Sequence, residues 1–173
     1  MNQVPEKLIS YRVYRDGVDL VGTADVQLPD LEAMTETIKG AGIAGEVDSP
    51  VLGHYGSMTL VLNWRTLVKP IAFLSRQEVH ALDLRGAVQV MDAAAGVYKV
   101  VPIRVAIRAT PKKTSLGKFD VGAPMESSNE LEVSYIKVSI DGADVIEIDK
   151  YNYIAKIDGV DVLADVRSAL GLV

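Results

Sequence analysis

The chain has 173 residues, of which 49% are hydrophobic and only 6% aromatic, and its formal net charge is −5. This composition is typical of a globular protein with an aliphatic core, and the length fits one domain spanning residues 1–173. Residues 130–173 carry nine acids against four bases, which argues against a basic surface built to hold nucleic acid.

Cysteine is absent, so the fold uses no disulfide and no thiolate zinc site, and a reducing cytoplasm suits it. The first ten residues, MNQVPEKLIS, lack the apolar segment of a signal peptide. No apolar run approaches the ~20 residues of a membrane span.

The N-terminal region is expected to form strands. Ile9 to Arg15 predicts one strand, Asp16-Gly17 a tight turn, and Val18 to Leu28 the returning strand. Leu31 to Lys39 fits both a helical stripe and an alternating strand, and its two threonines with the following glycine favour a strand.

A glycine-rich stretch follows, GAGIAGEVDSPVLGHYG, and residues Gly40 to Gly56 are expected to form one long loop. No Lys-Ser/Thr pair follows its glycines and no helix obviously begins after them, so a phosphate-binding loop is disfavoured. Long loops in compact domains are usually functional or disordered. We therefore expect the backbone here to bend closely against a neighbouring chain.

Residues Ser57 to Thr66 alternate between apolar and polar side chains, which predicts a half-buried strand with Trp64 in the core. Pro70 is expected to open a helix through Leu82 that buries Ile71, Leu74 and Val79. The other expected elements are strands at Leu84 to Met91, Val97 to Thr110 and Glu130 to Asp141, a loop at Pro111 to Ser128, and a helix at Val162 to Leu170.

The stretch from Glu130 to Asp158 is the most strongly patterned part of the chain. It is rich in Val, Ile and Tyr, and Asp-Gly occurs twice, at Asp141 and Asp158. Asp-Gly accepts the positive φ angles of a type I′ turn, so this stretch predicts a β-meander. Asp161 is placed to cap the C-terminal helix.

Residues with the spacing of a catalytic or metal site are not found. His54 and His80 have no spaced partners, and a third histidine does not exist. Carboxylate pairs such as Glu130 with Glu132 lie two apart on strands, as on a solvated β-surface. Neither a catalytic residue nor a bound cofactor or metal is expected. Two other classes stay open: a small β-barrel binding module, and an enzyme that uses an acidic pair.

Two stretches carry a resemblance to a known family. One is the loop GAGIAGEVDSPVLG with the strand SMTLVLNWRTL, and the other is the C-terminal run YIKVSIDGADVIEIDKYNYIAKIDGVDVLADVRSALGL. Because it carries these two stretches in this order, the chain resembles the major tail tube proteins of contractile-tailed phages and of R-type phage-tail-like bacteriocins. The resemblance runs almost end to end and is weakest at residues 112–128. The tube protein of type VI secretion systems is similar in fold and is kept as an alternative.

The resemblance implies an antiparallel β-barrel or sandwich with one packed helix and a short C-terminal helix. It implies hexameric rings, assembled in the bacterial cytoplasm, that stack into a hollow tube and close one lumen barrel. The implied partners are the chain itself, a sheath protein, baseplate and tail terminator proteins, and DNA passing down the lumen without stable binding. Such a tube is driven through the target envelope on contraction and is not embedded in a membrane before it.

Two hairpins are expected to build the lumen barrel: Leu31 to Lys39 with Ser57 to Thr66, and Val97 to Thr110 with Glu130 to Asp141. Contacts between subunits or rings are expected from Gly40, Gly42, Ile43, Gly45, Val47, Pro50, Val51 and Leu52. The lumen is expected to be lined by Thr35, Thr37, Lys39, Ser57, Thr59, Asn63, Arg65, Arg104, Arg108, Glu130, Glu132 and Ser134.

Overall fold

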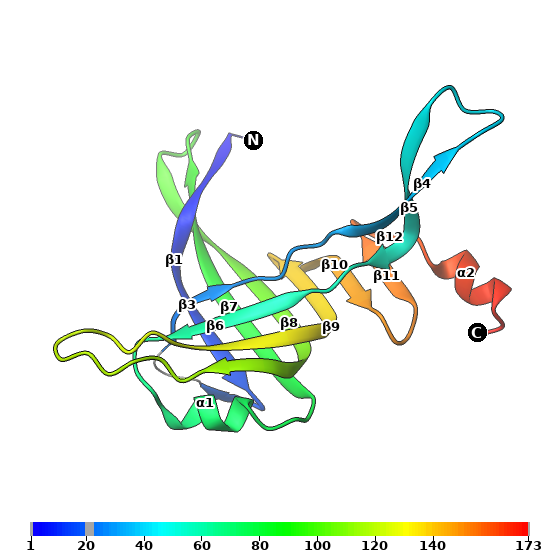
Figure 1. Ribbon diagram of the computed structural model, residues 1–173. Coiled ribbons are helices and arrows are strands. Elements are labelled where there is room, and N and C mark those ends of the chain that lie inside the picture. The colour runs from blue at the N-terminus through cyan, green and yellow to red at the C-terminus, as the bar shows by residue number, and fades with distance from the viewer. Residues whose placement is uncertain (1, 20–22, 173) are drawn as a thin grey trace.

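The computed structural model describes residues 2–19 and 23–172, which form mostly antiparallel β-structure with two short helices (Figure 1). The strands are β1 (Gln3–Arg15), β2 (Val18–Asp19), β3 (Thr23–Gln27), β4 (Ala33–Lys39), β5 (Glu46–Tyr55), β6 (Thr59–Trp64), β7 (His80–Asp92), β8 (Val97–Ser115), β9 (Ser127–Ile140), β10 (Ala143–Asp149), β11 (Ile154–Ile157) and β12 (Val160–Asp161). The helices are α1 (Lys69–Leu74) and α2 (Ala164–Ala169). The predicted fold class is confirmed, although among these residues the strands of one subunit do not close into a barrel.

Strand β9 organises the large sheet. Strand β8 pairs with it from Ile103 opposite Ile140 to Ser115 opposite Ser128. On its other side, β6 pairs with the first half of β9 and β10 with the second half. Beyond β8 the sheet continues through β7 and β1 to β2. The predicted pairing of Val97–Thr110 with Glu130–Asp141 is therefore confirmed.

Asp-Gly turns set the register at three places. Asp141 and Gly142 have φ angles of 50° and 79°, and Asp158 and Gly159 have φ angles of 49° and 80°. Asp16 and Gly17 repeat the pattern between β1 and β2. Two consecutive positive φ angles are the mark of a type I′ turn, as the sequence predicted. The expected return strand Val18–Leu28 is present as β2 and β3, and its residues 20–22 lie outside the described residues.

Strands β3 to β6 form one long two-stranded ribbon that is bent midway. Strand β3 pairs with β6 beside the large sheet, and β4 pairs with β5 in a separate hairpin that projects from the body (Figure 1). Leu31–Lys39 is thus a strand, as predicted, but its predicted partner Ser57–Thr66 is wrong. The partner of β4 is β5, because the ribbon turns back within the stretch that was expected to be a loop.

The expected long loop Gly40–Gly56 is therefore wrong as well. Only residues 40–45 form the turn, and Glu46–Tyr55 is strand β5. The register runs from Lys39 opposite Glu46 to Ala33 opposite Tyr55, with an irregularity between Ala33 and Thr35. Pro50 fits in β5 because this strand has no second neighbour in the described subunit, and proline is confined to such edges.

Helix α1 is shorter than predicted. It ends at Leu74, and the hydroxyl of the following Ser75 donates to the carbonyl of Ile71 at 2.7 Å. A serine that bonds back to the helix in this way favours termination. Val79 lies beyond the helix and is exposed, so its predicted burial is wrong, whereas Ile71 and Leu74 are buried as predicted.

Strand β8 is longer than predicted. It continues past Pro111 to Ser115, with a register irregularity between Pro111 and Lys113, so the expected loop Pro111–Ser128 is reduced to residues 116–126. At the C-terminus, the predicted helix is present as α2. The expectation that Asp161 caps it is wrong, because Leu163 is the N-cap residue and no side-chain hydrogen bond caps the helix. Asp161 instead accepts a hydrogen bond from the backbone N–H of Leu163.

The core lies between the curved large sheet and α1. Its side chains come from alternate positions of β6, β7, β8 and β9, and include Met58, Leu60, Leu62, Trp64, Leu82, Ile107, Leu131 and Val133. The buried Asn129 accepts a hydrogen bond from the Trp64 indole at 2.9 Å and donates to Thr114 at 3.2 Å. No helix in residues 2–19 and 23–172 has the length and apolarity to cross a bilayer.

Candidate functional site

The face of the large sheet opposite the core is polar and half-exposed. It arises from period-2 alternation, because the neighbours of buried Leu131 and Val133 on β9 are Glu130, Glu132 and Ser134. The same face receives Thr59 and Asn63 from β6, opposite Glu132 and Ser128. Strand β8 adds Arg104 and Arg108.

A first polar cluster surrounds Glu132. Its carboxylate accepts a hydrogen bond from Ser57 at 2.7 Å and from the Lys112 ammonium at 3.1 Å, and Lys112 also donates to Thr59 at 2.7 Å. Partial burial acts to raise the pKa of Glu132, but the bonds from Ser57 and Lys112 outweigh it and lower the pKa below its usual value.

A second cluster surrounds Asp83 on β7. Arg104 donates to one carboxylate oxygen at 2.9 Å and Arg85 to the other at 3.0 Å. Burial acts to raise the pKa of Asp83, and the two guanidinium groups reverse this and lower it. The neighbouring Arg108 stacks on the ring of Tyr135, with 4.9 Å between the guanidinium carbon and the ring centroid.

The charges of this face are therefore interleaved. A shallow basin of about 480 Å³ lies over β7, β8, β9 and β10 and is bordered by Asp83, Arg104, Arg108, Lys137 and Asp144. Lys137 pairs with Asp144 at 3.1 Å. Because acids and bases alternate across the basin, it presents no continuous track of one sign.

The projecting β4–β5 hairpin is the second candidate surface. Met34 and Ile38 on β4 and Val47, Val51 and Leu52 on β5 are all exposed. Ile38 lies directly opposite Val47, and on the other face Thr37 donates to Asp48 at 2.7 Å. A two-stranded hairpin with exposed apolar side chains and exposed edges is marginally stable in water by itself, so this surface is suited to a partner.

The base of the hairpin is anchored to the body of the subunit. The backbone N–H of Gly56 donates to the carbonyl of Glu32 at 2.8 Å, and the Lys150 ammonium donates to the carbonyl of Gly56 at 2.7 Å. Tyr55 packs against the core. The hairpin is therefore held at a defined angle, and its outer part extends away from the rest of the chain (Figure 1).

The predicted contact residues all lie on this hairpin. Gly40, Gly42, Ile43 and Gly45 form its tip, and Val47, Pro50, Val51 and Leu52 lie on β5. The three tip glycines have φ angles of 126°, 89° and 112°, with no other atom near the position of an added Cβ. Within the subunit, these positions need glycine because their φ angles are positive, and not because another backbone approaches closely.

The predicted lumen residues divide into two groups. Ser57, Thr59, Asn63 and Arg65, on β6 or beside it, accompany Arg104, Arg108, Glu130, Glu132 and Ser134 of β8 and β9 in the large sheet. Thr35, Thr37 and Lys39 lie apart, on β4. Sequence reasoning missed Lys112, Asp83 and Tyr135. Alternation along β7 could have placed Asp83 on this face. It could not have placed Lys112, which lies within the register irregularity between Pro111 and Lys113.

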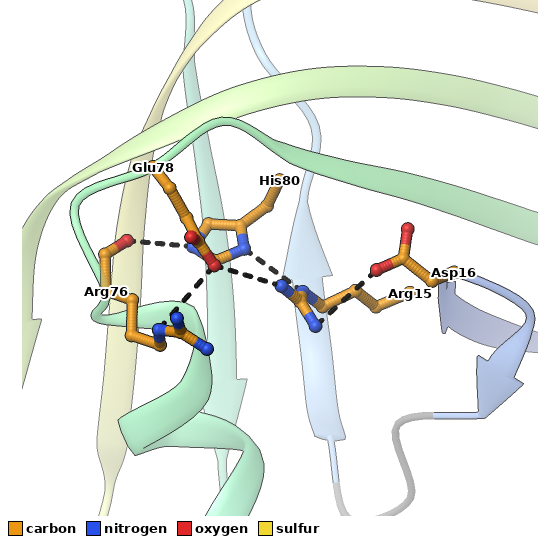
Figure 2. Close-up of polar contacts among 5 residues, drawn as sticks. All are labelled: Arg15, Asp16, Arg76, Glu78 and His80. Atoms are coloured by element: carbon orange, nitrogen blue, oxygen red, sulfur yellow. Dashed lines mark hydrogen bonds and ion pairs between the residues drawn. The ribbon is translucent and has the colours of Figure 1, made fainter.

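A polar cluster centred on the buried His80 ties β1 to the connection between α1 and β7 (Figure 2). The ring of buried His80 bonds through Nε2 to the carbonyl of Arg76 at 2.9 Å, and its Nδ1 accepts from Nε of Arg15 at 3.0 Å. Arginine only donates, so the ring proton lies on Nε2. Within the described residues, no group of three His, Asp or Glu side chains is placed to hold a metal ion.

A curved antiparallel sheet with an uncovered hairpin and an interleaved polar face defines a class of structural β-proteins built to assemble. The chain belongs to the phage tail tube protein FII family, whose model matches residues 5–171. It is a structural subunit of the tube of a contractile tail.

The curated relatives are similar over almost their whole length. The tail tube protein of Escherichia phage P2 is 30% identical over 176 residues, covering 98% of this chain and 99% of the relative. The major tail tube protein of Serratia phage KSP20 is 25% identical over 171 residues, covering 98% of each. The predicted resemblance to tail tube proteins is therefore confirmed.

Solved structures share the fold at low sequence identity. A sheath/tube terminator of the extracellular contractile injection system PVC, in its extended state, has a TM-score of 0.54 at 14% identity and covers 78% of this chain and 96% of its own. A chain of the PVC sheath–tube complex in the extended state has a TM-score of 0.51 at 14% identity, covering 75% and 87%.

Proposed function

We propose that six copies of this chain form a ring, and that the rings stack into a hollow tube. The observation that carries the proposal is the β4–β5 hairpin, which exposes Met34, Ile38, Val47 and Val51 with no covering element among the described residues. Covering four such side chains at ~1.5–3 kcal/mol each would be a substantial gain for any assembled state. A neighbouring copy is the partner consistent with a tube subunit.

The polar face of the large sheet lines the lumen in this proposal. Its opposite face is committed to the core, since Leu60, Leu62 and Leu131 are fully buried, so the half-exposed face is the one available to line a channel. Asp83 offsets one of its two arginine partners and Glu132 offsets Lys112, so acids are interspersed among the bases of that surface. DNA can then pass without a continuous basic track to hold it.

The partners belong to the same proposal. The solved relatives come from structures of a sheath–tube complex and of a sheath/tube terminator, which supports a sheath and a tail terminator as partners. A baseplate is proposed as a further partner from the family resemblance alone. Contraction of the sheath would drive the tube through the target envelope. We assign no enzymatic activity, because Asp83 and Glu132 of the polar face are engaged with Arg85, Arg104 and Lys112.

Negative-stain electron microscopy of the purified protein tests this proposal. The wild type should form rings or hollow tubes with sixfold end views. In a variant whose tip, residues 40–45, is replaced by Asn-Gly, the type I′ turn still joins Lys39 to Glu46 in register. Because this variant changes the tip and keeps strands β4 and β5, it shows the effect of the tip alone on assembly.

A second variant, Ile38→Ser with Val47→Ser, removes the apolar cross-strand pair in the outer part of the hairpin and leaves the core untouched. We expect it to remain a folded monomer by circular dichroism and to form no tubes. A strictly monomeric wild type at high concentration would contradict the ring. Normal tubes from the serine variant would contradict the role of the hairpin.

A further inference from the structure

The loop between β8 and β9, residues 116–126, has a well-defined shape despite its length. The backbone N–H of Lys118 donates to the carbonyl of Met125 at 3.0 Å, and that of Met125 donates to the carbonyl of Arg65 at 2.7 Å. The hydroxyl of Ser127 closes the base of the loop by donating to the carbonyl of Leu116 at 2.9 Å. Gly117 has a φ of 85°, and an added Cβ would collide with the carbonyl oxygen of Met125. The loop is therefore preorganised.

The apolar side chains of this loop point away from the subunit. Leu116 is 63% exposed, Phe119 is 94% exposed, and Val121 is fully exposed. The loop projects from the sheet (Figure 1). Single exposed apolar residues are ordinary, but three in one ordered loop call for a partner. An exposed phenyl ring on a preorganised loop has the properties of an interface anchor, because little entropy is lost when it is buried.

An apolar groove lies beside α1 at the same end of the sheet. It has a volume of about 280 Å³ and is lined by the residues Arg15, Asp16, Val18, Lys69, Pro70, Phe73 and Leu74. An apolar cavity of ~150 Å³ already accommodates benzene, so this groove has room for a phenyl ring. No residue of the 116–126 loop is among those that line it.

One wall of the groove is fixed by the polar cluster of Figure 2. Arg15 is held by His80, by Glu78 at 3.4 Å and by Asp16 at 3.6 Å. Its guanidinium carbon lies 3.8 Å from the centroid of the Phe73 ring. Because Arg15 is locked from three sides, the groove keeps its shape when empty, and its wall offers a planar cation and an aromatic ring to an incoming side chain.

The charges beside the ring and beside the groove are complementary. Phe119 lies between Lys118 and Asp120 in the sequence. The groove carries Asp16 and Lys69, and the Asp16 side chain is 67% exposed. A ring seated in the groove could therefore place Lys118 near Asp16 and Asp120 near Lys69, which favours one orientation of docking.

We propose that Phe119 of one copy seats in the α1 groove of the neighbouring copy and so joins subunits around the ring. The inference rests on the proposed homomeric ring and names two surfaces that form it. Loop and groove belong to the same end of the subunit, since Thr114 at the loop base lies 2.7 Å from Ser75 just after α1. In the proposed ring each copy offers its loop to one neighbour and its groove to the other, so the contact is heterologous and closes.

Cysteine cross-linking tests the contact cleanly, because the chain has no cysteine of its own. A variant with Val121→Cys and Val18→Cys places one thiol on the loop and one in the groove. Mild oxidation of assembled protein should give a covalent ladder up to the hexamer. The control pair, Val121→Cys with Val4→Cys, places the second thiol near the N-terminal end of β1, at a side chain that is 49% exposed, and should give no ladder.

Cross-linking should be compared only in samples that electron microscopy shows to contain tubes. Tubes in which the loop–groove pair cross-links no better than the control would overturn the contact and leave the proposed function standing. Cross-linking of Val121→Cys to another segment in such tubes would also overturn it. A wild type that forms no ring or tube would instead count against the proposed function itself.

Replacement of the anchor provides the second test. Phe119→Ser should leave the melting temperature unchanged, because the ring is exposed in the subunit, while the critical concentration for assembly rises roughly tenfold or more. Tyr151→Ser, at a second aromatic residue that is 83% exposed, is the matched control and should assemble like wild type. Equal assembly of the Phe119→Ser and Tyr151→Ser proteins would overturn the proposal.

Discussion

Leu163 lies directly against Gly53, and this contact joins the C-terminal segment to strand β5 at the base of the projecting hairpin. A Cβ at Gly53 would collide with the side chain of Leu163, and the φ of Gly53 is 65°. Leu163 is itself buried and is the N-cap residue of α2. The angle of the hairpin therefore depends on one glycine in β5 and one leucine more than a hundred residues later.

Gly53→Ala should destabilise the subunit by about 1–3 kcal/mol, because it combines overpacking with a strained backbone. Tube formation should fall more steeply than stability, since the hairpin loses its fixed angle. Urea unfolding and negative-stain microscopy measure the two effects. Gly56→Ala is the control, because its added Cβ would lie 3.7 Å from the Glu32 carbonyl, an ordinary contact. Equal behaviour of the two variants would show that the Leu163 contact is unimportant.

Asn129→Ala should cost about 1–3 kcal/mol of folding free energy. The substitution leaves the buried indole N–H of Trp64 without its acceptor and removes the amide that reaches Thr114. Trp64 is the only tryptophan, so its fluorescence reports unfolding directly in a urea titration. Ser128→Ala, one position away on the half-exposed face, should change the midpoint little. A midpoint shift no larger than that of Ser128→Ala would contradict the role of the network.

The fold was predictable where one face of a strand is buried. Strands β6, β8 and β9 alternate strongly because Leu60, Ile107 and Leu131 enter the core, and Asp-Gly marks the turn that follows β9. Strand β5 was missed because its side chains before Tyr55 are not packed in the core of the subunit, so selection for a core leaves no period-2 pattern in most of it. The pairing of β5 with β4 could not be predicted either, because the ribbon bends between β3 and β4.

The polar face was partly predictable for the same reason. Glu130, Glu132, Arg104 and Arg108 follow from alternation with buried neighbours. The ion pairs among them do not, because they depend on the lateral register of strands, and the irregularity near Pro111 is what carries Lys112 to Glu132. The groove beside α1 gave no sequence signal, because Arg15 and Phe73 are brought together only by the packing of β1 against the helix.

Acid should destabilise the subunit through Glu132. Its pKa is lowered in the folded state, so the unfolded chain binds the proton more readily. The stabilisation is therefore present at neutral pH and is lost as the pH falls below the usual glutamate value of 4.5. Unfolding free energies measured between pH 7 and pH 3 should fall less steeply for Glu132→Gln than for wild type. Parallel curves for the two proteins would rule this linkage out.

The charge balance of the polar face should control the passage of DNA if that face lines the lumen. Glu130→Lys with Ser128→Lys adds three positive charges per subunit on neighbouring positions of one face of β9, and sixfold repetition multiplies the change. These two positions leave Glu132 and its bonds to Ser57 and Lys112 intact, so the subunit should fold and assemble. The variant tubes should retain DNA fragments at low salt and release them steeply as salt rises, because phosphate contacts release counterions. Retention is measured by pelleting tubes with labelled DNA across a salt series, with Asp165→Lys and Ser168→Lys on α2 as a control that adds the same three positive charges away from β9. Equal retention by the two variants, or none by the β9 variant, would place this face outside the lumen.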